Sequence, residues 1–344
     1  MMRLGLDSYS LRWQGWDAFQ FLDYAAKLGL DNVQFSERNN LASHEDAYLR
    51  ELKAYADNLG LTMEVGMGSF DRFAASFRPE FGSGEEQLTA MLHVAAAVGS
   101  PVVRCFLGSQ DERLGAVPLH EHIAECVRTL RAVAPLVRET GIKIAVENHG
   151  GVDLLARELR NLIEMVGPET VGVCLDTGNP PYAAEDPLLS TAILVPYAIT
   201  THLRDTKVWA TPEGAAAQWV PLGAGSADLP AILALLAQHA PTIAINLEVI
   251  TGTPPANIPY LTPETPFWER YPAMLAADFA RYVALAGRGT PGPFEQRLLP
   301  KSLWLPPEDQ IEDYRAQQRH HFEQSVHHAR TVLSLGTRGQ DTGV

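Results

Sequence analysis

Four acidic or imidazole side chains each follow a short apolar run in the second half of the chain: Glu147, Asp176, His202 and Glu248. Carboxylates crowded together repel one another and resist ionisation unless a cation compensates them. Three oxygen ligands and one imidazole suit Mn²⁺, Mg²⁺ or Co²⁺, and suit Zn²⁺ less well without thiolates or further histidines. One such acid alone would as readily be a helix cap or an ion-pair partner. Four in succession predict a single divalent metal ion, with Mn²⁺ or Mg²⁺ favoured.

A further imidazole lies just beyond the first of these predicted ligands. His149 is followed by Gly150 and Gly151, which either let the backbone approach a ligand closely or merely turn the chain. The histidine could act as a general acid or base facing a substrate. It could also support the site from behind or cap a helix, and the sequence leaves both interpretations open.

Polar residues near other apolar runs could line a substrate pocket. The candidate substrate-binding residues are Glu37, Arg104, Asn179, Arg204 and Lys207. Strand alternation would point Arg204 inward together with His202. Lys207 is the preferred contact for a substrate anion, with a solvated loop lysine as the alternative. Asp205 could accept the second N–H of His202 and so orient its ring.

Elements that would position these residues are indicated by alternating short apolar runs and amphipathic stretches. The predicted strands are 4–6, 32–35, 62–66, 102–106, 143–146, 171–175, 198–202 and 243–247. The helices predicted between them are 16–28, 45–59, 85–98, 121–139, 154–165, 187–195 and 229–239. Such alternation implies parallel βαβ units, and eight of them close into a barrel.

The predicted fold class is therefore α/β, a (β/α)₈ TIM barrel with a C-terminal helical extension. Its active site is expected at the carboxyl ends of the strands. Glycine follows several predicted helices, at positions 60 and 99 for example, where a helix end needs a positive φ. An open doubly wound sheet is the alternative, but no Gly-rich phosphate loop follows the first predicted strand.

The pattern changes after Glu248. Residues 251–267 are rich in Pro and Thr and predict an ordered loop over the barrel mouth. A helix over 268–286 would close the eighth unit, so residues 1–287 would form the metal-binding catalytic barrel. Residues 288–344 are predicted to be an extension, with one long helix over 308–335 and a disordered tail from 336. The long helix would pack on the barrel or on a second subunit, and a homo-oligomer is expected.

Composition narrows the class of protein. The 344 residues are 46% hydrophobic and 20% charged, as in an ordinary soluble enzyme. No run approaches the roughly 18 apolar residues of a membrane span, and Asp7 comes too early for a signal peptide. A cytoplasmic location is expected, with no membrane partner. The three cysteines are widely spaced and predict buried thiols, not a disulfide framework.

Charge argues against a nucleic-acid partner. The formal net charge is −14 and no stretch is rich in lysine or arginine, whereas binding to a phosphate backbone needs the opposite sign. A small anionic substrate is still compatible, because one local arginine or lysine can capture a carboxylate.

Five short motifs make the chain resemble the sugar phosphate isomerase/epimerase family, also called xylose isomerase-like barrels, over roughly residues 3–287. They are Val146-Glu147-Asn148, Leu175-Asp176-Thr177-Gly178-Asn179, Thr201-His202-Leu203-Arg204-Asp205, Pro221-Leu222-Gly223-Ala224-Gly225 and Leu247-Glu248. The resemblance implies that the four predicted ligands bind one metal. For the ketose 3-epimerases of this family it further implies that the matching glutamates, Glu147 and Glu248, move protons on opposite faces of the substrate.

Two departures from the family pattern bear on the reaction. The 3-epimerases carry a histidine three residues after the metal-binding aspartate, where this chain has Asn179. Asn can hydrogen-bond a hydroxyl but cannot shuttle a proton. The DNA-repair branch of the family needs additional histidines and a basic surface, which this sequence lacks.

The resemblance therefore implies a small-molecule sugar or sugar acid as substrate, and two reaction classes. One is a metal-dependent isomerase or epimerase that acts on a keto-sugar through a metal-stabilised enediolate, with Glu147, Glu248 and His149 as catalytic residues. The alternative is a metal-dependent lyase: a decarboxylase of a 3-oxo sugar acid, a keto-inositol dehydratase or a 3-oxo-glycoside lyase. Both need a polarised carbonyl, so the metal ligands do not separate them. A non-enzymatic sugar-binding protein on a barrel that has lost its activity is disfavoured. Such a barrel would have lost at least one charged metal ligand, whereas the set of four is intact in this sequence.

Overall fold

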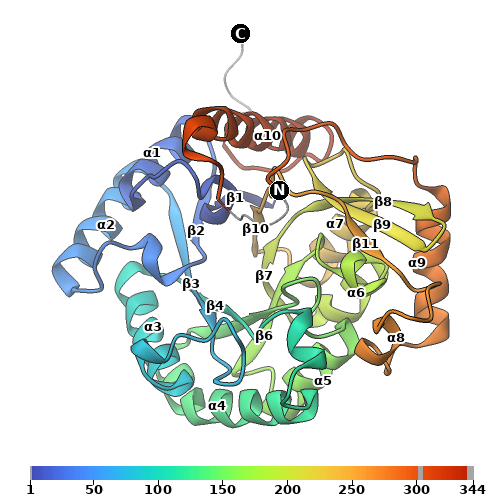
Figure 1. Ribbon diagram of the computed structural model, residues 1–344. Coiled ribbons are helices and arrows are strands. Elements are labelled where there is room, and N and C mark those ends of the chain that lie inside the picture. The colour runs from blue at the N-terminus through green and yellow to red at the C-terminus, as the bar shows by residue number, and fades with distance from the viewer. Residues whose placement is uncertain (1, 301–304, 339–344) are drawn as a thin grey trace.

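The computed structural model describes residues 2–300 and 305–338. Within them, eight parallel strands form one sheet in the order β10-β1-β2-β3-β4-β5-β6-β7, surrounded by helices (Figure 1). The strands are β1 (Arg3–Asp7), β2 (Asn32–Phe35), β3 (Thr62–Ser69), β4 (Val102–Phe106), β5 (Lys143–Glu147), β6 (Val171–Asp176), β7 (Ala198–His202) and β10 (Ala244–Leu247). A parallel bridge between Leu203 and Leu247 joins β10 to the end of β7. The sheet is thereby closed, and the predicted barrel is confirmed.

Helices cover the outer face of each strand. After β1 to β7 come α1 (Ala18–Lys27), α2 (Asp46–Leu59), α3 (Gly84–Val98), α4 (Leu119–Thr140), α5 (Ala156–Val166), α6 (Pro187–Leu194) and α7 (Leu229–His239). Strands buried on both faces read as apolar runs, which is why the sequence locates them well. The predicted helix-ending glycines Gly60 and Gly99 have φ values of 66° and 74°. In the described parts of the chain, every helix is too short or too polar to span a bilayer.

The eighth position in the helix ring is filled by α10 (Ile311–Thr331), which lies between α1 and α7 (Figure 1). Its Phe322, Val326 and Ala329 belong to the same buried apolar cluster as the barrel strands. The expectation that segment 268–286 closes the eighth unit was wrong, because that segment packs elsewhere. The predicted C-terminal helix supplies the missing cover instead.

Three strands after β7 were not predicted. β8 (Asp205–Thr211) and β9 (Gly214–Val220) form an antiparallel hairpin, and β11 (Ala256–Ile258) adds to β9. The small residues of β9, Ala215 to Ala217, hide the alternation that signals a strand. The helices α8 (Phe267–Arg270) and α9 (Ala276–Arg288) replace the single predicted helix, and both contribute to a second apolar cluster with this sheet.

The segment after α10 is held to the barrel in its first residues. The backbone N–H of Gly336 donates to the Met2 carbonyl at 3.0 Å, and that of Thr337 donates to Asp31 at 2.9 Å. The predicted disorder is therefore wrong for residues 336–338. Residues 339–344 lie outside the described residues.

Truncation of a buried α10 side chain should destabilise the whole barrel. Phe322 is fully buried in the main cluster, so Phe322→Ala is expected to lower the free energy of unfolding by about 3–5 kcal/mol. Val332, just beyond the same helix, is 61% exposed, and Val332→Ala should change it by less than about 0.5 kcal/mol. Denaturant titration measures both values. Equal, small effects would show that α10 is not part of the barrel's cooperative core.

Candidate active site

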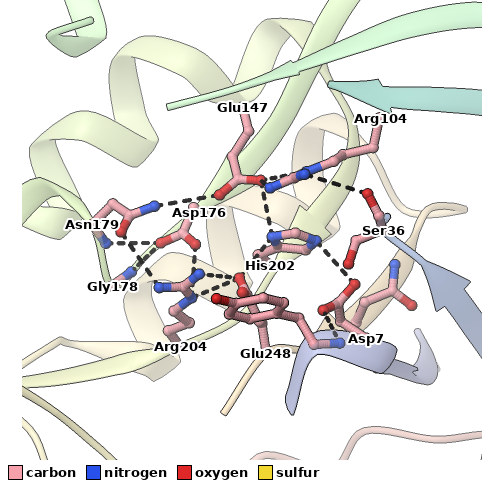
Figure 2. A network of polar contacts seen from close by, with 12 residues as sticks. Asp7, Ser36, Arg104, Glu147, Asp176, Gly178, Asn179, His202, Arg204 and Glu248 are labelled. Carbon is pink, nitrogen blue, oxygen red and sulfur yellow. Dashed lines mark hydrogen bonds and ion pairs between the residues drawn. The ribbon is translucent and has the colours of Figure 1, made fainter. Parts of the chain in front are cut away.

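The four predicted metal ligands meet at the carboxyl end of the barrel. Glu147, Asp176 and His202 are the last residues of β5, β6 and β7, and Glu248 directly follows β10. Each offers one ligand atom, these atoms all lie within 4.8 Å of one another, and all four residues are buried. Figure 2 shows their side chains converging. The structure thus brings together the complete set that the sequence predicted.

Two of the converging atoms have no hydrogen-bond partner of good geometry among the described residues. They are Asp176 Oδ2 and His202 Nδ1. His202 Nδ1 lies 2.8 Å from Glu248 Oε2 and 3.1 Å from Glu147 Oε2. Buried polar atoms are nearly always hydrogen-bonded. His202 Nδ1 faces two acceptor-only carboxylates, which fits a shared cation, and this donor set suits a divalent ion.

The His202 ring is oriented from within the barrel by Gln34, which sequence reasoning did not identify. His202 Nε2 contacts the side-chain oxygen of Gln34. The Gln34 amide nitrogen donates to Glu64 Oε2 at 2.7 Å, and Thr200 donates to the same oxygen at 2.6 Å. A carboxylate only accepts hydrogen bonds, so Gln34 turns its oxygen toward the histidine. Nε2 therefore carries a proton, and Nδ1 is the ring nitrogen that faces Glu147 and Glu248 and could bind a metal ion.

Two buried arginines partly compensate the carboxylates. Arg104 Nε donates to Glu147 Oε2 at 2.6 Å. Arg204 Nε lies 2.9 Å from Asp176 Oδ2 and 2.7 Å from Glu248 Oε2, as Figure 2 shows. Alternation had pointed Arg204 inward, and its position agrees. Both arginines line the cavity beside the cluster.

These charges separate the pKa values of the carboxyl groups. Burial raises the pKa of Glu147, but Arg104 and His202 outweigh burial and hold it well below its usual range. Burial also raises the pKa of Glu248, but Arg204 and His202 lower it more, to about 2. At Asp176, burial and the neighbouring glutamates raise the pKa to about 7 despite Arg204. Without further positive charge, Asp176 is therefore the least compensated carboxylate.

His149 lies in the wall of the cavity beside this cluster. Its ring stacks on Phe106 with centroids 3.7 Å apart, and Nδ1 donates to the Gly108 carbonyl at 2.7 Å. Because that carbonyl can only accept, Nε2 keeps its lone pair. Burial lowers the His149 pKa to about 4, so the ring is neutral near pH 7. Asp153 fixes this arrangement, since it accepts from the backbone N–H groups of both His149 and Gly108 at 3.0 Å.

The cavity has a volume of about 490 Å³. Its lining includes the predicted residues Glu37, Arg104, His149, Asn179, Arg204 and Glu248. Asn179 donates to Glu147 Oε1 at 3.3 Å and to the Asn148 carbonyl at 2.9 Å. The lining also includes four aromatic residues that were not predicted to face a substrate, namely Tyr9, Phe106, Tyr182 and Trp219. Trp219 comes from the unpredicted β8–β9 hairpin, and so no sequence signal placed it here.

Two expectations about the segment after β7 were wrong. Lys207 is not among the described residues that line the cavity; its Nζ lies 5.8 Å from the centroid of the Trp209 ring. In the hairpin, Thr206 pairs with Trp219, and adjacent Lys207 therefore projects from the opposite face. Asp205 does not orient His202. Its carboxylate accepts from backbone N–H groups of the turn after β9, including Gly225 at 2.9 Å.

Fold and site together define a closed parallel barrel with a buried candidate metal centre at the carboxyl ends of its strands. A model of the xylose isomerase-like TIM barrel family matches residues 22–266, and the chain belongs to this family.

The chain has distant similarity to one curated relative and to several solved structures. The chain is 23% identical over 211 residues to a 3-oxo-isoapionate decarboxylase from Pectobacterium atrosepticum, covering 59% of this chain and 69% of that protein. It superposes on a D-psicose 3-epimerase with D-tagatose from Clostridium cellulolyticum with a TM-score of 0.59 at 17% identity, over 83% of this chain and 96% of that one. It also superposes on a xylose isomerase-like barrel protein from Mycobacterium smegmatis in complex with magnesium. The TM-score is 0.58 at 15% sequence identity, and the superposition covers 83% of this chain and 97% of that one. These likenesses establish the shared fold.

Proposed function

We propose that the protein is a divalent-metal-dependent isomerase or epimerase acting on a keto-sugar or a related sugar derivative. The observation that carries this proposal is the convergence of Glu147, Asp176, His202 and Glu248 within 4.8 Å in a buried cluster. A magnesium complex of a barrel with the same fold is in keeping with a metal at this place. Mn²⁺ or Mg²⁺ is the proposed ion, because oxygen ligands predominate.

The ion, when bound, would polarise a substrate carbonyl and stabilise the negative charge of an enediolate. Around it, Arg104, Arg204 and Asn179 would hold substrate hydroxyl and carbonyl oxygens by hydrogen bonds. Tyr182 and Trp219 would cover an apolar sugar face and exclude water. The cavity of about 490 Å³ encloses a substrate of monosaccharide size.

Proton transfer is assigned to His149 and the two glutamates. Arg104 and Arg204 hold Glu147 and Glu248 ionised, as metal ligands must be. His149 offers a neutral imidazole in the wall of the same cavity, and among the described residues its Nε2 has no hydrogen-bond partner. It can therefore accept a substrate proton at Nε2 while Nδ1 stays on the Gly108 carbonyl.

The second candidate is a metal-dependent lyase of the same family. It is favoured by His149 in the cavity wall, by Asn179 at the position where the 3-epimerases have histidine, and by the similarity to a decarboxylase. A 3-oxo sugar acid, a keto-inositol or a 3-oxo-glycoside would then be the substrate. The carbonyl would be held in the same way, and the bond that breaks would differ.

Chelation and isotope exchange test both candidates. EDTA should abolish turnover and Mn²⁺ or Mg²⁺ should restore it, whereas NAD, PLP and ATP should have no effect. The Mn²⁺-loaded enzyme is incubated in D₂O with ketoses, 3-oxo sugars and 3-oxo sugar acids. Mass spectrometry should then show deuterium exchange at carbon for an epimerase, or loss of CO₂, water or aglycone for a lyase. Full activity after metal removal, verified by elemental analysis, would contradict the metal-dependent mechanism.

A further inference from the structure

A second, larger cavity adjoins the one that contains the candidate metal centre. Its volume is about 730 Å³, and it shares the lining residues Glu37 and Phe106 with the metal cavity. Its walls come from the loop after β2, residues 37–44, and from residues 67–81 after and within β3. A monosaccharide held at the metal would leave this chamber empty. We call it the distal chamber.

Two arginines in the distal chamber have no anionic partner. Among the described residues, the guanidinium groups of Arg38 and Arg78 make neither an ion pair nor a side-chain hydrogen bond, whereas Arg104 nearby is fully engaged. Arg38 lies over the Phe81 ring, 4.7 Å from its centroid, and is partly buried. Its pKa is lowered by that burial alone, with no carboxylate contributing. Arg78 is exposed, whereas Arg38 is a partly desolvated cation without a counter-ion, and such a cation favours the binding of an anion.

The two acidic residues of the chamber do not fill that role. The Glu37 carboxylate faces away toward Arg104, at 3.8 Å from its nearest guanidinium nitrogen. Glu80 is exposed, and the described structure has no ion pair between it and either arginine. The loop that carries Arg38 is also fixed: Asn40 Oδ1 accepts from the Glu37 N–H at 2.8 Å, and His44 Nε2 donates to the Arg38 carbonyl at 3.3 Å. These hydrogen bonds hold the backbone of the loop, and the Arg38 guanidinium contacts the Phe81 ring.

We infer that the distal chamber binds an anionic group, a carboxylate or a phosphate, on the part of the substrate that lies away from the metal. The inference rests on the proposed function for the identity of the reacting end. The substrate would cross Phe106, with its carbonyl at the metal ligands and its anionic group between Arg38 and Arg78. Guanidinium groups bind carboxylate and phosphate in the same forked geometry, so the chamber by itself accepts either.

Calorimetric titration of the metal-loaded protein tests this assignment. The probes are D-fructose, which is neutral, 5-keto-D-gluconate, which carries a carboxylate, D-fructose 6-phosphate and inorganic phosphate. At least one anionic sugar should bind about tenfold or more tightly than fructose. The double variant Arg38→Met/Arg78→Met should lose that advantage while its fructose affinity stays within about twofold. Arg50→Met, which removes an arginine with a 71% exposed side chain on α2, is the matched control and should behave as wild type.

The outcomes separate this inference from the metal proposal. Inorganic phosphate should still bind to an Asp176→Asn variant, because the distal arginines do not depend on the metal ligands. Preference for 5-keto-D-gluconate or for D-fructose 6-phosphate identifies the anion. No saturable binding of any anionic probe to the wild type would overturn the inference. So would equal losses for neutral and anionic sugars in the double variant, or no loss in either.

Discussion

Replacement of Asp176 by Asn should abolish stoichiometric divalent-metal binding and lower turnover by at least about 10³-fold. Asp176 Oδ1 already accepts from the backbone N–H groups of Gly178 and Asn179, at 2.7 and 2.8 Å. An asparagine can keep those two bonds with its own Oδ1. What changes is Oδ2, the buried oxygen without a good hydrogen bond, which becomes an NH₂ group with no lone pair to offer a metal ion.

The measurement is metal content after gel filtration, together with calorimetric titration of Mn²⁺ and turnover on whichever substrate the D₂O panel identifies. Asp46→Asn, at an acid whose side chain is 85% exposed on α2, is the matched control and should leave all three unchanged. One equivalent of Mn²⁺ bound by the Asp176→Asn variant with unaltered affinity would remove Asp176 from the ligand set. An undisturbed circular dichroism spectrum distinguishes loss of a ligand from loss of the fold.

His149→Ala should cut kcat by about 10²–10⁴-fold while one metal ion still binds. The reason is geometric: the ring is held on Phe106 and Gly108 with its Nε2 lone pair free in the cavity wall, and alanine removes the only imidazole among the cavity's described lining residues. If the two glutamates alone move protons, the same change should reduce kcat only modestly, through looser packing of the cavity wall.

This variant therefore separates a direct role of His149 in proton transfer from proton transfer by the two glutamates alone. The control is His93→Ala, at an exposed histidine on α3, which should change neither kcat nor metal content. A loss smaller than about tenfold, with metal content intact, would refute the direct role of His149 and support proton transfer by Glu147 and Glu248. A large loss accompanied by loss of metal would instead show that His149 acts by supporting the adjacent ligand.

Much of the barrel could be predicted from local patterns. The predicted limits of β4 and β7 coincide with the observed ones, and β3 runs three residues longer, to Ser69. Strands buried on both faces are apolar along most of their length, and several helices end where a glycine such as Gly60 adopts a positive φ. The four candidate metal ligands could be expected to lie together, because parallel strands bring their carboxyl ends to one edge of the sheet.

Where the chain departs from the repeating unit, local patterns misled. The hairpin β8–β9 is rich in alanine and shows little alternation, so Trp219 was missed and Lys207 was assigned to the wrong face. The eighth helix was placed at 268–286 because that segment comes next in sequence. Only packing decides that α10 fills this position, through side chains such as Phe322 that are buried against the barrel.

Sequence alone therefore determined the architecture and the types of residue at the strand ends. Tertiary structure alone decided what those residues are paired with: Gln34 meets His202 across 168 positions of the chain, and Arg104 meets Glu147 across 43. Such distant contacts set the orientation of the His202 ring, the tautomer of His149 and the ionisation of the glutamates. They also leave Arg38 without an anionic partner among the described residues. The physical reason is that periodicity reports which face of an element is buried, whereas hydrogen bonds, electric fields and cavities depend on where other elements come to lie.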